Sequence, residues 1–272
     1  MTTVLSNLIL ETVRWQPHRP GDNGTVNLLP TLIAVGLLVA VTTGLLLARR
    51  IPRPWDPLWA IARAILQLAL LTFILSGIIS DARWVALALT VMFGAAVYTV
   101  GRRIAQSRRD IVLIAGALAA GIAVPMLVVF PTGAVAFSGR YLLALGGIVI
   151  GGAMSVATLT GRHFREALVS RRDEVEAWLS LGATTRQSVR DLGTRAVFNA
   201  LVPTTDQTRT TGLVALPGAF VGSIFGGASV LEAGVFQVIV LTSILAAGII
   251  TALLLSSGLG ASVSVLPTTL DI

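Results

Sequence analysis

Long runs of apolar residues with few or no charges constrain the fold of this chain more than any other feature. An α-helix needs about 20 consecutive, predominantly apolar residues to cross the roughly 30 Å hydrocarbon core of a bilayer. Alternation with a period of two is absent, so the runs do not predict the strands of a membrane β-barrel. The sequence therefore predicts an all-α, polytopic integral membrane protein with about seven transmembrane helices, at 28–47, 58–79, 84–100, 111–130, 141–159, 197–221 and 235–255.

The composition agrees with this class and excludes several chemistries. Charged residues make up only 12 % of the chain, about half of the share in a soluble domain. All basic residues are arginines, and a P-loop needs a lysine to reach the nucleotide phosphates, so the chain cannot hydrolyse ATP by that route. The absence of cysteine excludes a disulfide framework and a thiolate metal site. We expect no catalytic residue and no cofactor on this chain.

The arginines are unevenly distributed among the loops that connect the predicted helices. Fourteen lie in the loops after the first, third and fifth helices, and four lie on the opposite side, at Arg14, Arg19, Arg83 and Arg140. The positive-inside rule then predicts an N-terminus outside the cell and a cytoplasmic C-terminus. Contact with anionic lipid explains the basic balance, so we expect no nucleic-acid partner. Residues 1–27 are predicted to form an extracytoplasmic tail or interfacial helix, and 28–272 the transmembrane domain.

The predicted cytoplasmic loop at 161–196, between spans five and six, is long enough to present a surface. Within 174–187, charged residues give way to apolar ones around Trp178, and Gly182 is a plausible helix stop. Thr184 followed three residues later by Gln187 fits a capping box that starts a second helix. One interpretation of the loop is a solvated hairpin that only joins two spans. Apolar side chains beside a tight turn favour a protein contact instead.

Residues 176–183, Glu-Ala-Trp-Leu-Ser-Leu-Gly-Ala, resemble the EAA loop of ABC-transporter permeases, in which E-A-A is followed by three residues and a glycine. Trp178 stands where that loop has its second alanine. The resemblance implies a cytoplasmic coupling helix that fits a cleft in a separate ATP-binding subunit. The residues that it assigns to this contact are Glu176, Ala177, Trp178, Leu181, Gly182, Ala183 and Thr184.

Four further segments, at 63–68, 182–184, 201–204 and 212–218, resemble the FetB-like iron-export ABC permeases, whose plant relatives are aluminium-tolerance membrane subunits. This resemblance implies a permease in the cell membrane that exports iron or another metal. It also implies two copies of this chain working with two copies of an ATP-binding subunit, which would hold the ATP and Mg²⁺.

Two charges interrupt the sixth predicted span. Asp206 and Arg209 are three residues apart and therefore lie on one helix face, where they can pair. A charge at the bilayer centre costs at least about 2.5 to 3.5 kcal/mol, so such groups face protein or water. The pair is either a structural lock or part of a polar strip along the transport path or dimer seam. The polar neighbours favour the strip; they include Thr204, Thr205, Gln207 and Thr208.

Other polar or small residues in the spans extend these predictions. Arg63 and Gln67, in the second span, either reach the cytoplasmic surface or contribute to the transport path. Pro203 and Pro217 predict a kinked or unwound backbone in the sixth span. Small residues spaced by four permit close packing of helices, here or in a dimer interface. These glycines are Gly147 and Gly151 in the fifth span, and Gly218, Gly222 and Gly226.

The cargo is not defined by the residues themselves. Only two histidines exist, His18 and His163, and neither lies in a predicted span, so no metal site is assigned. One alternative is a gradient-driven secondary transporter with Asp206 as the proton or ion carrier. Another is an ABC permease for a non-metal cargo such as a sugar nucleotide. A membrane-embedded enzyme is disfavoured because no span has a catalytic motif, and a non-transporting sensor subunit stays open.

Overall fold

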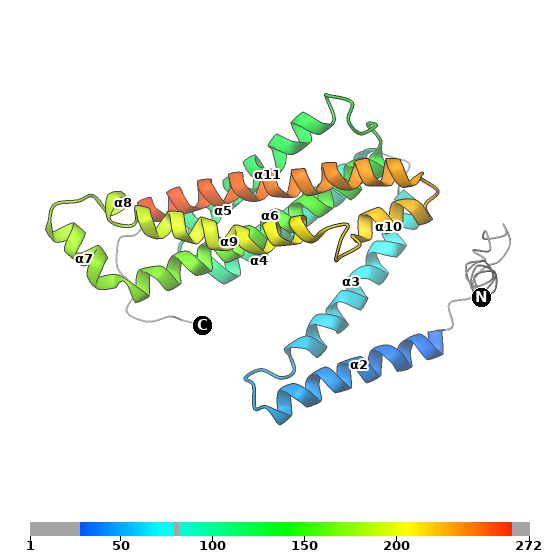
Figure 1. The fold of residues 1–272 in the computed structure, drawn as a ribbon, viewed down its shortest axis with the longest axis horizontal. Coiled ribbons are helices and arrows are strands. Elements are labelled where there is room, and N and C mark those ends of the chain that lie inside the picture. The colour runs from blue at the N-terminus through cyan, green and yellow to red at the C-terminus, as the bar shows by residue number, and fades with distance from the viewer. Residues whose placement is uncertain (1–27, 79–81, 263–272) are drawn as a thin grey trace, which may run out of the picture. The chain divides into compact units, whose positions relative to one another are not determined.

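The computed structural model describes residues 28–78 and 82–262, and most of these residues are helical. Within these ranges there is no β-strand, so the all-α prediction is confirmed. The tail predicted at 1–27 lies outside the described residues. The helices (Figure 1) are α2 (Leu28–Ala48), α3 (Asp56–Ile78), α4 (Ala82–Ile104), α5 (Arg108–Val129), α6 (Gly139–Ser170), α7 (Arg172–Ser180), α8 (Thr185–Ser188), α9 (Arg190–Thr210), α10 (Gly218–Phe225) and α11 (Val230–Ser262).

Five of the described helices, namely α2, α4, α5, α6 and α11, are long and apolar enough to cross a membrane. Their outer surfaces carry exposed apolar side chains, such as Val112 and Leu127 on α5. An extended apolar surface of this kind is matched to lipid and not to water. The predicted span at 58–79 coincides with the helix α3, which is not among these five.

The prediction of one transmembrane helix over 197–221 is wrong. The helix α9 starts earlier, at Arg190, and ends at Thr210, and α10 begins only at Gly218. Gly212 adopts a positive φ of 85°, a conformation that helices do not contain. The helix is interrupted because of the backbone geometry at Gly212 and Pro217, although the residues between them are apolar. A hydropathy count considers only side chains and therefore did not predict the interruption.

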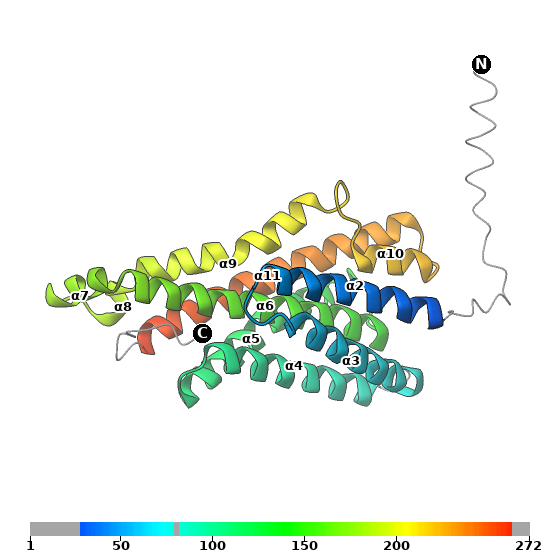
Figure 2. The same cartoon turned by 90° about the horizontal axis from the view of Figure 1, so that it is seen from below.

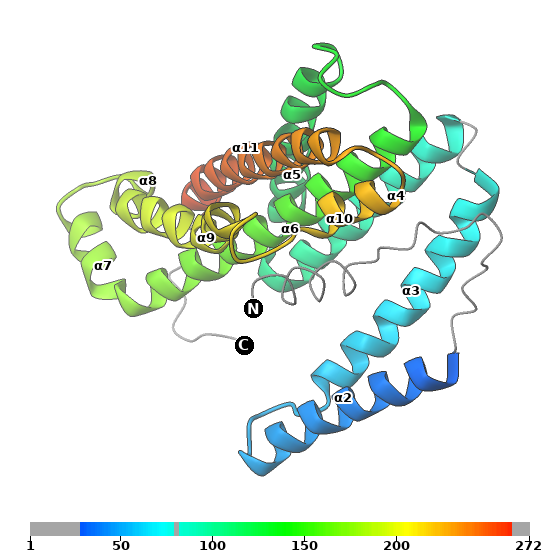
Figure 3. The ribbon, with the colours of Figure 1, turned by 45° about the vertical axis from the view of Figure 1, so that its right-hand side comes forward.

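The chain forms two compact units, residues 1–74 and 75–272. In the first unit, α2 is joined to the start of α3 through a short loop. In the second unit, α11 packs against α5, α6 and α9, and α6 also packs against α4. Figure 2 shows these five helices of the second unit lying side by side. In Figure 3, α7 and α8 project beyond the ends of α9 and α11.

Small residues allow the helices of the second unit to approach closely. A Cβ added at Gly121 on α5 would lie 2.7 Å from the backbone oxygen of Ala247 on α11. Similar crowding occurs on α6, where Gly146 faces Leu89 of α4 and Gly152 faces Ile244 of α11, each at 2.8 Å. These contacts hold the apolar core of the unit, which includes Val100, Leu118, Leu145, Val149 and Leu255.

The glycines predicted for helix packing occupy different surroundings. A Cβ at Gly147 would lie 3.0 Å from Met92 Cε, so Gly147 does face a neighbouring helix. Gly151, Gly218 and Gly222 have nothing within 4 Å, and Gly226 meets only carbonyls of its own helix. For these four, packing against a second copy of the chain stays a prediction.

Candidate functional site

The hairpin of α7 and α8 is defined by one sharp turn. Gly182 has φ of 87°, which L-residues with a side chain rarely adopt. Its N–H donates to Leu179 O at 3.0 Å, and Ala183 N–H donates to Trp178 O at 3.0 Å, the two bonds of a Schellman motif. Thr184 and Gln187 then form the predicted capping box at the start of α8. The sequence signals of a helix stop and a helix start are therefore both confirmed.

An apolar cluster anchors the base of this hairpin. Val175 on α7 is 1 % exposed and packs with Phe164 and Leu168 of α6 and with Val189 and Leu192 beside it. The apolar face of α6 thus continues to Ser170, well beyond the predicted span at 141–159. The hairpin and the start of α9 consequently share one small core.

Ion pairs on the surface also hold the base of the hairpin in place. Arg171 pairs with Glu174 at 2.6 Å and with Asp191 at 3.1 Å, and Asp191 also accepts from Arg195 at 2.9 Å. The hydrogen bond from Arg171 holds the pKa of Asp191 below its usual value, and the same bond raises the pKa of Arg171. The carboxylate therefore ties the end of α6 to α9 in its ionised form.

The tip of the hairpin presents apolar side chains that nothing in the described chain covers. Leu181 is 81 % exposed and Trp178 is 51 % exposed. Ala177 and Thr184 are exposed as well, whereas Ala183 is half-buried. Glu176 pairs with Arg172 at 2.6 Å. All seven residues predicted for coupling thus lie on or beside one projecting turn.

The polar strip predicted around Asp206 lies on α9 beyond its packed half. In the described chain the carboxylate of Asp206 pairs with Arg209 at 3.3 Å, and the two side chains are 57 % and 75 % exposed. Gln207 is also exposed, and Thr204, Thr205 and Thr208 are half-buried. The Thr208 hydroxyl donates to Thr204 O at 2.8 Å. The pair links two positions of α9 and does not join it to another described helix.

The unwound backbone predicted from Pro203 and Pro217 is confirmed in part: residues 211–217 after α9 are not helical, whereas α9 continues through Pro203 to Thr210. The backbone turns back on itself, with Gly212 N–H donating to Ala215 O and Val214 N–H to Thr210 O, both at 2.9 Å. Leu213 is 90 % exposed, and Leu216 is also exposed. The signal for this turn was present, since a glycine at 212 and a proline at 217 bracket the apolar residues.

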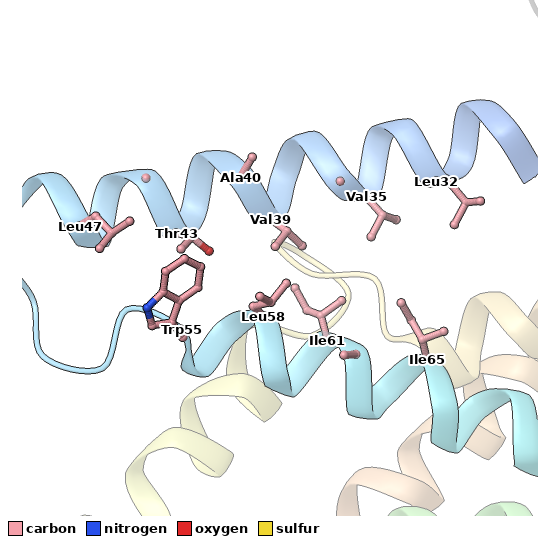
Figure 4. A pocket seen from close by; sticks show the side chains of 13 residues that line it. Leu32, Val35, Val39, Ala40, Thr43, Leu47, Trp55, Leu58, Ile61 and Ile65 are labelled. Carbon is pink, nitrogen blue, oxygen red and sulfur yellow. The ribbon is translucent and has the colours of Figure 1, made fainter.

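The first unit holds Arg63 and Gln67, both exposed on α3. It also contains an apolar groove of about 550 Å³ between α2 and α3, which the sequence did not indicate. Figure 4 shows Trp55, Leu58 and Ile61 of this groove facing α2. The Thr43 hydroxyl lies buried there, and no described residue forms a hydrogen bond with it.

No group of three or more His, Cys, Asp or Glu side chains is gathered within the described ranges. His163, the one histidine in those ranges, contacts Glu166 at 3.2 Å on the surface of α6.

Five membrane-length helices and a projecting helical hairpin define a multi-pass helical membrane protein. The chain belongs to the uncharacterised protein family UPF0014, whose model matches residues 29–263. The resemblance to FetB-like permeases is thereby confirmed, because a FetB protein is among the relatives of this chain.

Relatives of the chain include two plant proteins and one bacterial protein that match more than two thirds of it. The UPF0014 membrane protein STAR2 of Oryza sativa subsp. japonica is 35 % identical over 89 % of this chain and 86 % of its own length. Protein ALUMINUM SENSITIVE 3 of Arabidopsis thaliana is 33 % identical over 68 % of this chain and 69 % of its own. The probable iron export permease protein FetB of Escherichia coli (strain K12) is 28 % identical over 80 % and 83 %. No solved structure matches the chain.

Proposed function

We propose that this chain is the membrane-spanning permease subunit of an ATP-driven ABC exporter of the cell membrane. The observation that carries the proposal is the hairpin of α7 and α8, whose base is locked into the bundle and whose tip is apolar and exposed. A large apolar side chain on a projecting turn is the kind of anchor that fills a pocket of a partner protein. Residues 174–187 would dock into a separate ATP-binding subunit, which holds ATP and Mg²⁺.

The hairpin is connected so that its motion reaches the transport path. Val189 lies between α8 and α9 and is buried with Val175 of α7, so the three helices move together at this point. Asp206 lies sixteen residues along α9 from Arg190, which is about 24 Å in a helix. A rigid tilt of the hairpin during nucleotide hydrolysis would therefore displace the polar strip within the membrane.

The exposed pair of Asp206 and Arg209 supports a dimeric transporter. A charge cannot face hydrocarbon without a cost of several kcal/mol, and these side chains are uncovered in the described part of a single chain. A second copy that meets the first along α9 and α10 would enclose the strip in a shared polar seam. The open faces of Gly218 and Gly222 would permit a close approach there.

Iron, or another metal ion, is the proposed cargo because a relative carries the name of an iron export permease. Thr204, Thr205, Gln207, Thr208 and Asp206 offer oxygen ligands, which suit a hard cation and release it readily. A non-metal cargo such as a sugar nucleotide is the alternative within the same class of transporter.

Reconstitution into vesicles tests the function. The chain is incorporated with its ATP-binding subunit, and efflux of ⁵⁵Fe, of other divalent metals and of labelled sugar nucleotides is followed. We expect flux only with the partner subunit and hydrolysable ATP. Flux driven by a proton gradient without nucleotide would instead support the second candidate, a secondary transporter in which Asp206 carries the proton.

A further inference from the structure

A cavity of about 630 Å³ opens at the arginine-rich end of the second unit, between the start of α9 and the end of α11. The two helices are antiparallel and closely packed there. A Cβ added at Gly260 would lie 3.1 Å from Val189, and one added at Gly193 would lie 2.5 Å from Ser256 Oγ. The ends of both helices meet near α8 in Figure 1. The walls of the cavity therefore belong to one rigid seam.

The cavity carries an uncompensated positive charge. Arg186 and Arg190 line it, and its lining contains no carboxylate. Neither arginine forms an ion pair with any residue that the structure describes, because the nearby Asp191 is held by Arg171 and Arg195. Two like charges that line one cavity, Arg186 on α8 and Arg190 at the start of α9, repel each other. An anion between them would remove that repulsion.

The hydrogen-bond donors of the cavity suit a phosphate. A guanidinium group can donate two parallel bonds to phosphate oxygens. The Ser256 hydroxyl has no hydrogen bond to any described residue, whereas the Thr184 hydroxyl donates to Gln187 Oε1 and the Ser257 hydroxyl donates to Leu254 O, both at 2.9 Å. The Thr194 hydroxyl donates to Arg190 O at 3.1 Å. Within the described chain, the side chains of the lining with donor hydrogens left for a ligand are therefore those of Arg186, Arg190, Ser256 and the Gln187 amide.

The opposite end of the cavity is apolar. Val197 lies seven residues along α9 from Arg190, which is about 10 Å. Leu253 of α11 lines the same end and is more than half exposed. Because α11 is apolar enough to cross a membrane, the cavity runs from a charged mouth toward the part of the bundle that faces hydrocarbon. A bare inorganic anion would leave this apolar end to water.

We propose that the cavity binds an anionic phospholipid, with the head-group phosphate on Arg186 and Arg190 and the start of an acyl chain against Val197 and Leu253. A volume of this size lies in the range of pockets that hold ligands of several hundred daltons. Basic cavities between transmembrane helices are suited to lipid head groups. The lipid would be a structural ligand, distinct from any transported cargo and from any partner subunit.

The position of the cavity gives the lipid a specific consequence. Thr184 and Gln187, which form the capping box of α8, lie at its rim. A lipid bridging α8, α9 and α11 would therefore stiffen the joint between the hairpin and α9. Hydrogen exchange of residues 184–193 reports on this joint directly.

Lipid binding to the purified full-length chain tests the proposal. The chain is delipidated in a mild detergent and titrated with phosphatidylglycerol or with phosphatidylcholine of the same acyl chains, and native mass spectrometry measures the bound fraction. We expect phosphatidylglycerol to bind at least about 10-fold more tightly and to slow exchange at 184–193. Replacing Arg186 and Arg190 together by glutamine should weaken its binding about 30-fold, which corresponds to about 2 kcal/mol for two arginines.

A matched variant controls for general attraction to the arginine-rich surface. Arg102 and Arg103, at the exposed end of α4, do not line the cavity, and Arg102→Gln with Arg103→Gln should change lipid affinity less than about 2-fold. Equal weakening by both double variants would overturn the proposal, as would equal binding of the two lipids. Both pairs are exposed, so unchanged melting temperatures are expected and verify folding.

Two further arms separate the lipid from a free anion. Leu253→Gln alters only the apolar end and should weaken phosphatidylglycerol binding while the arginines remain. Inorganic phosphate, added in place of lipid, should not protect 184–193. Protection by inorganic phosphate equal to that by phosphatidylglycerol, together with no effect of Leu253→Gln, would overturn the lipid as the ligand.

Discussion

The helices α9 and α11 share a closely packed seam, yet they are built in opposite ways. α11 is apolar along 33 residues and buries Ala233, Val240 and Ala247 at intervals of seven, one face packed over most of its length. α9 buries Leu192, Ala196 and Ala200 in its first half, and none of its residues after Ala200 is fully buried.

This difference indicates a division of labour. A helix that is packed along its whole length cannot shift without disturbing the core, because protein interiors are close-packed. A helix that is packed at one end and polar at the other can be moved from that end. α11 is therefore suited to be the frame of the second unit, and α9 to carry motion from the hairpin to the polar strip.

The largest expected effect tests the proposal that an ATP-binding subunit moves α9 through the hairpin. Leu181→Asp places a charge at the exposed apolar tip, where a docking pocket would have to desolvate it. We expect binding to the ATP-binding subunit to weaken about 30-fold or more, as for an interface residue worth at least about 2 kcal/mol, and ATP-driven flux to be lost. Co-purification and vesicle transport measure the two effects.

Asp173→Asn is the control, because Asp173 lies at the other end of α7 and is exposed. The melting temperature of Leu181→Asp should match that of the unaltered chain. If Leu181→Asp transported normally, the hairpin would not be the coupling element, and the contrast between α9 and α11 would lose its functional meaning.

A smaller effect is expected at the polar end of α9. Asp206→Asn should reduce flux about 10-fold or more while expression and melting temperature stay nearly unchanged, because an exposed ion pair contributes little to stability. Asn199→Ala, an exposed polar change in the packed half of α9, is the matched control. Equal losses of flux and of folded protein in Asp206→Asn would identify the pair as a structural lock.

On the α11 side, the prediction concerns stability alone. Gly121→Ala would place a methyl group 2.7 Å from the Ala247 carbonyl, and overpacking of this kind costs about 1 to 3 kcal/mol. Gly116→Ala, on the same helix with nothing within 4 Å, should leave the melting temperature unchanged or raise it. Binding of the ATP-binding subunit to folded Gly121→Ala should be normal. A selective loss of that binding would mean that α11 also takes part in coupling.

The sequence predicted α11 better than α9, for a physical reason. Hydropathy measures how favourably side chains transfer into lipid. The side chains at 235–255 are apolar enough for this measure to predict a span there, although α11 extends further at both ends. Those extensions, like the continuation of α6 to Ser170, depend on packing against other helices, as Phe164 and Leu168 do at the hairpin base. A count of apolar residues contains no term for such tertiary contacts.

Features that depend on neighbouring residues in the sequence were predicted correctly, whereas contacts between helices were predicted less well. The turn at Gly182 and the capping box at Thr184 depend on residues within one turn of helix, and the sequence predicted both. Of the two glycines of α6 chosen by their spacing, Gly147 faces Met92 but Gly151 has nothing within 4 Å, and tighter contacts are made by their neighbours Gly146 and Gly152. The spacing of glycines identifies a face of small residues, but it does not show on which side the neighbouring helix lies. The proposed lipid cavity could not be predicted for the same reason, because it depends on how α9 and α11 lie against each other.

The smallest expected effect tests the anchor that joins the hairpin to α9. The bond from Arg171 lowers the pKa of Asp191 in the folded chain. The stabilisation is therefore present above the ordinary carboxyl pKa, about 3.9, and is lost as the pH falls through the lower value of the folded state. Hydrogen exchange, corrected for its intrinsic pH dependence, should show the hairpin loosening below about pH 4, with no matching change in the middle of α11.

Asp191→Asn isolates this contribution. It removes the charge that Arg171 and Arg195 both contact, so the variant at neutral pH should show the loosened hairpin and little further change on acidification. Glu166→Gln, an exposed carboxyl on α6 outside this network, serves as the control and should retain the pH response. If the hairpin of Asp191→Asn stayed protected at neutral pH, the apolar cluster around Val175 would be sufficient to couple it to α9. The ion pairs would then have no part in setting α9 apart from α11.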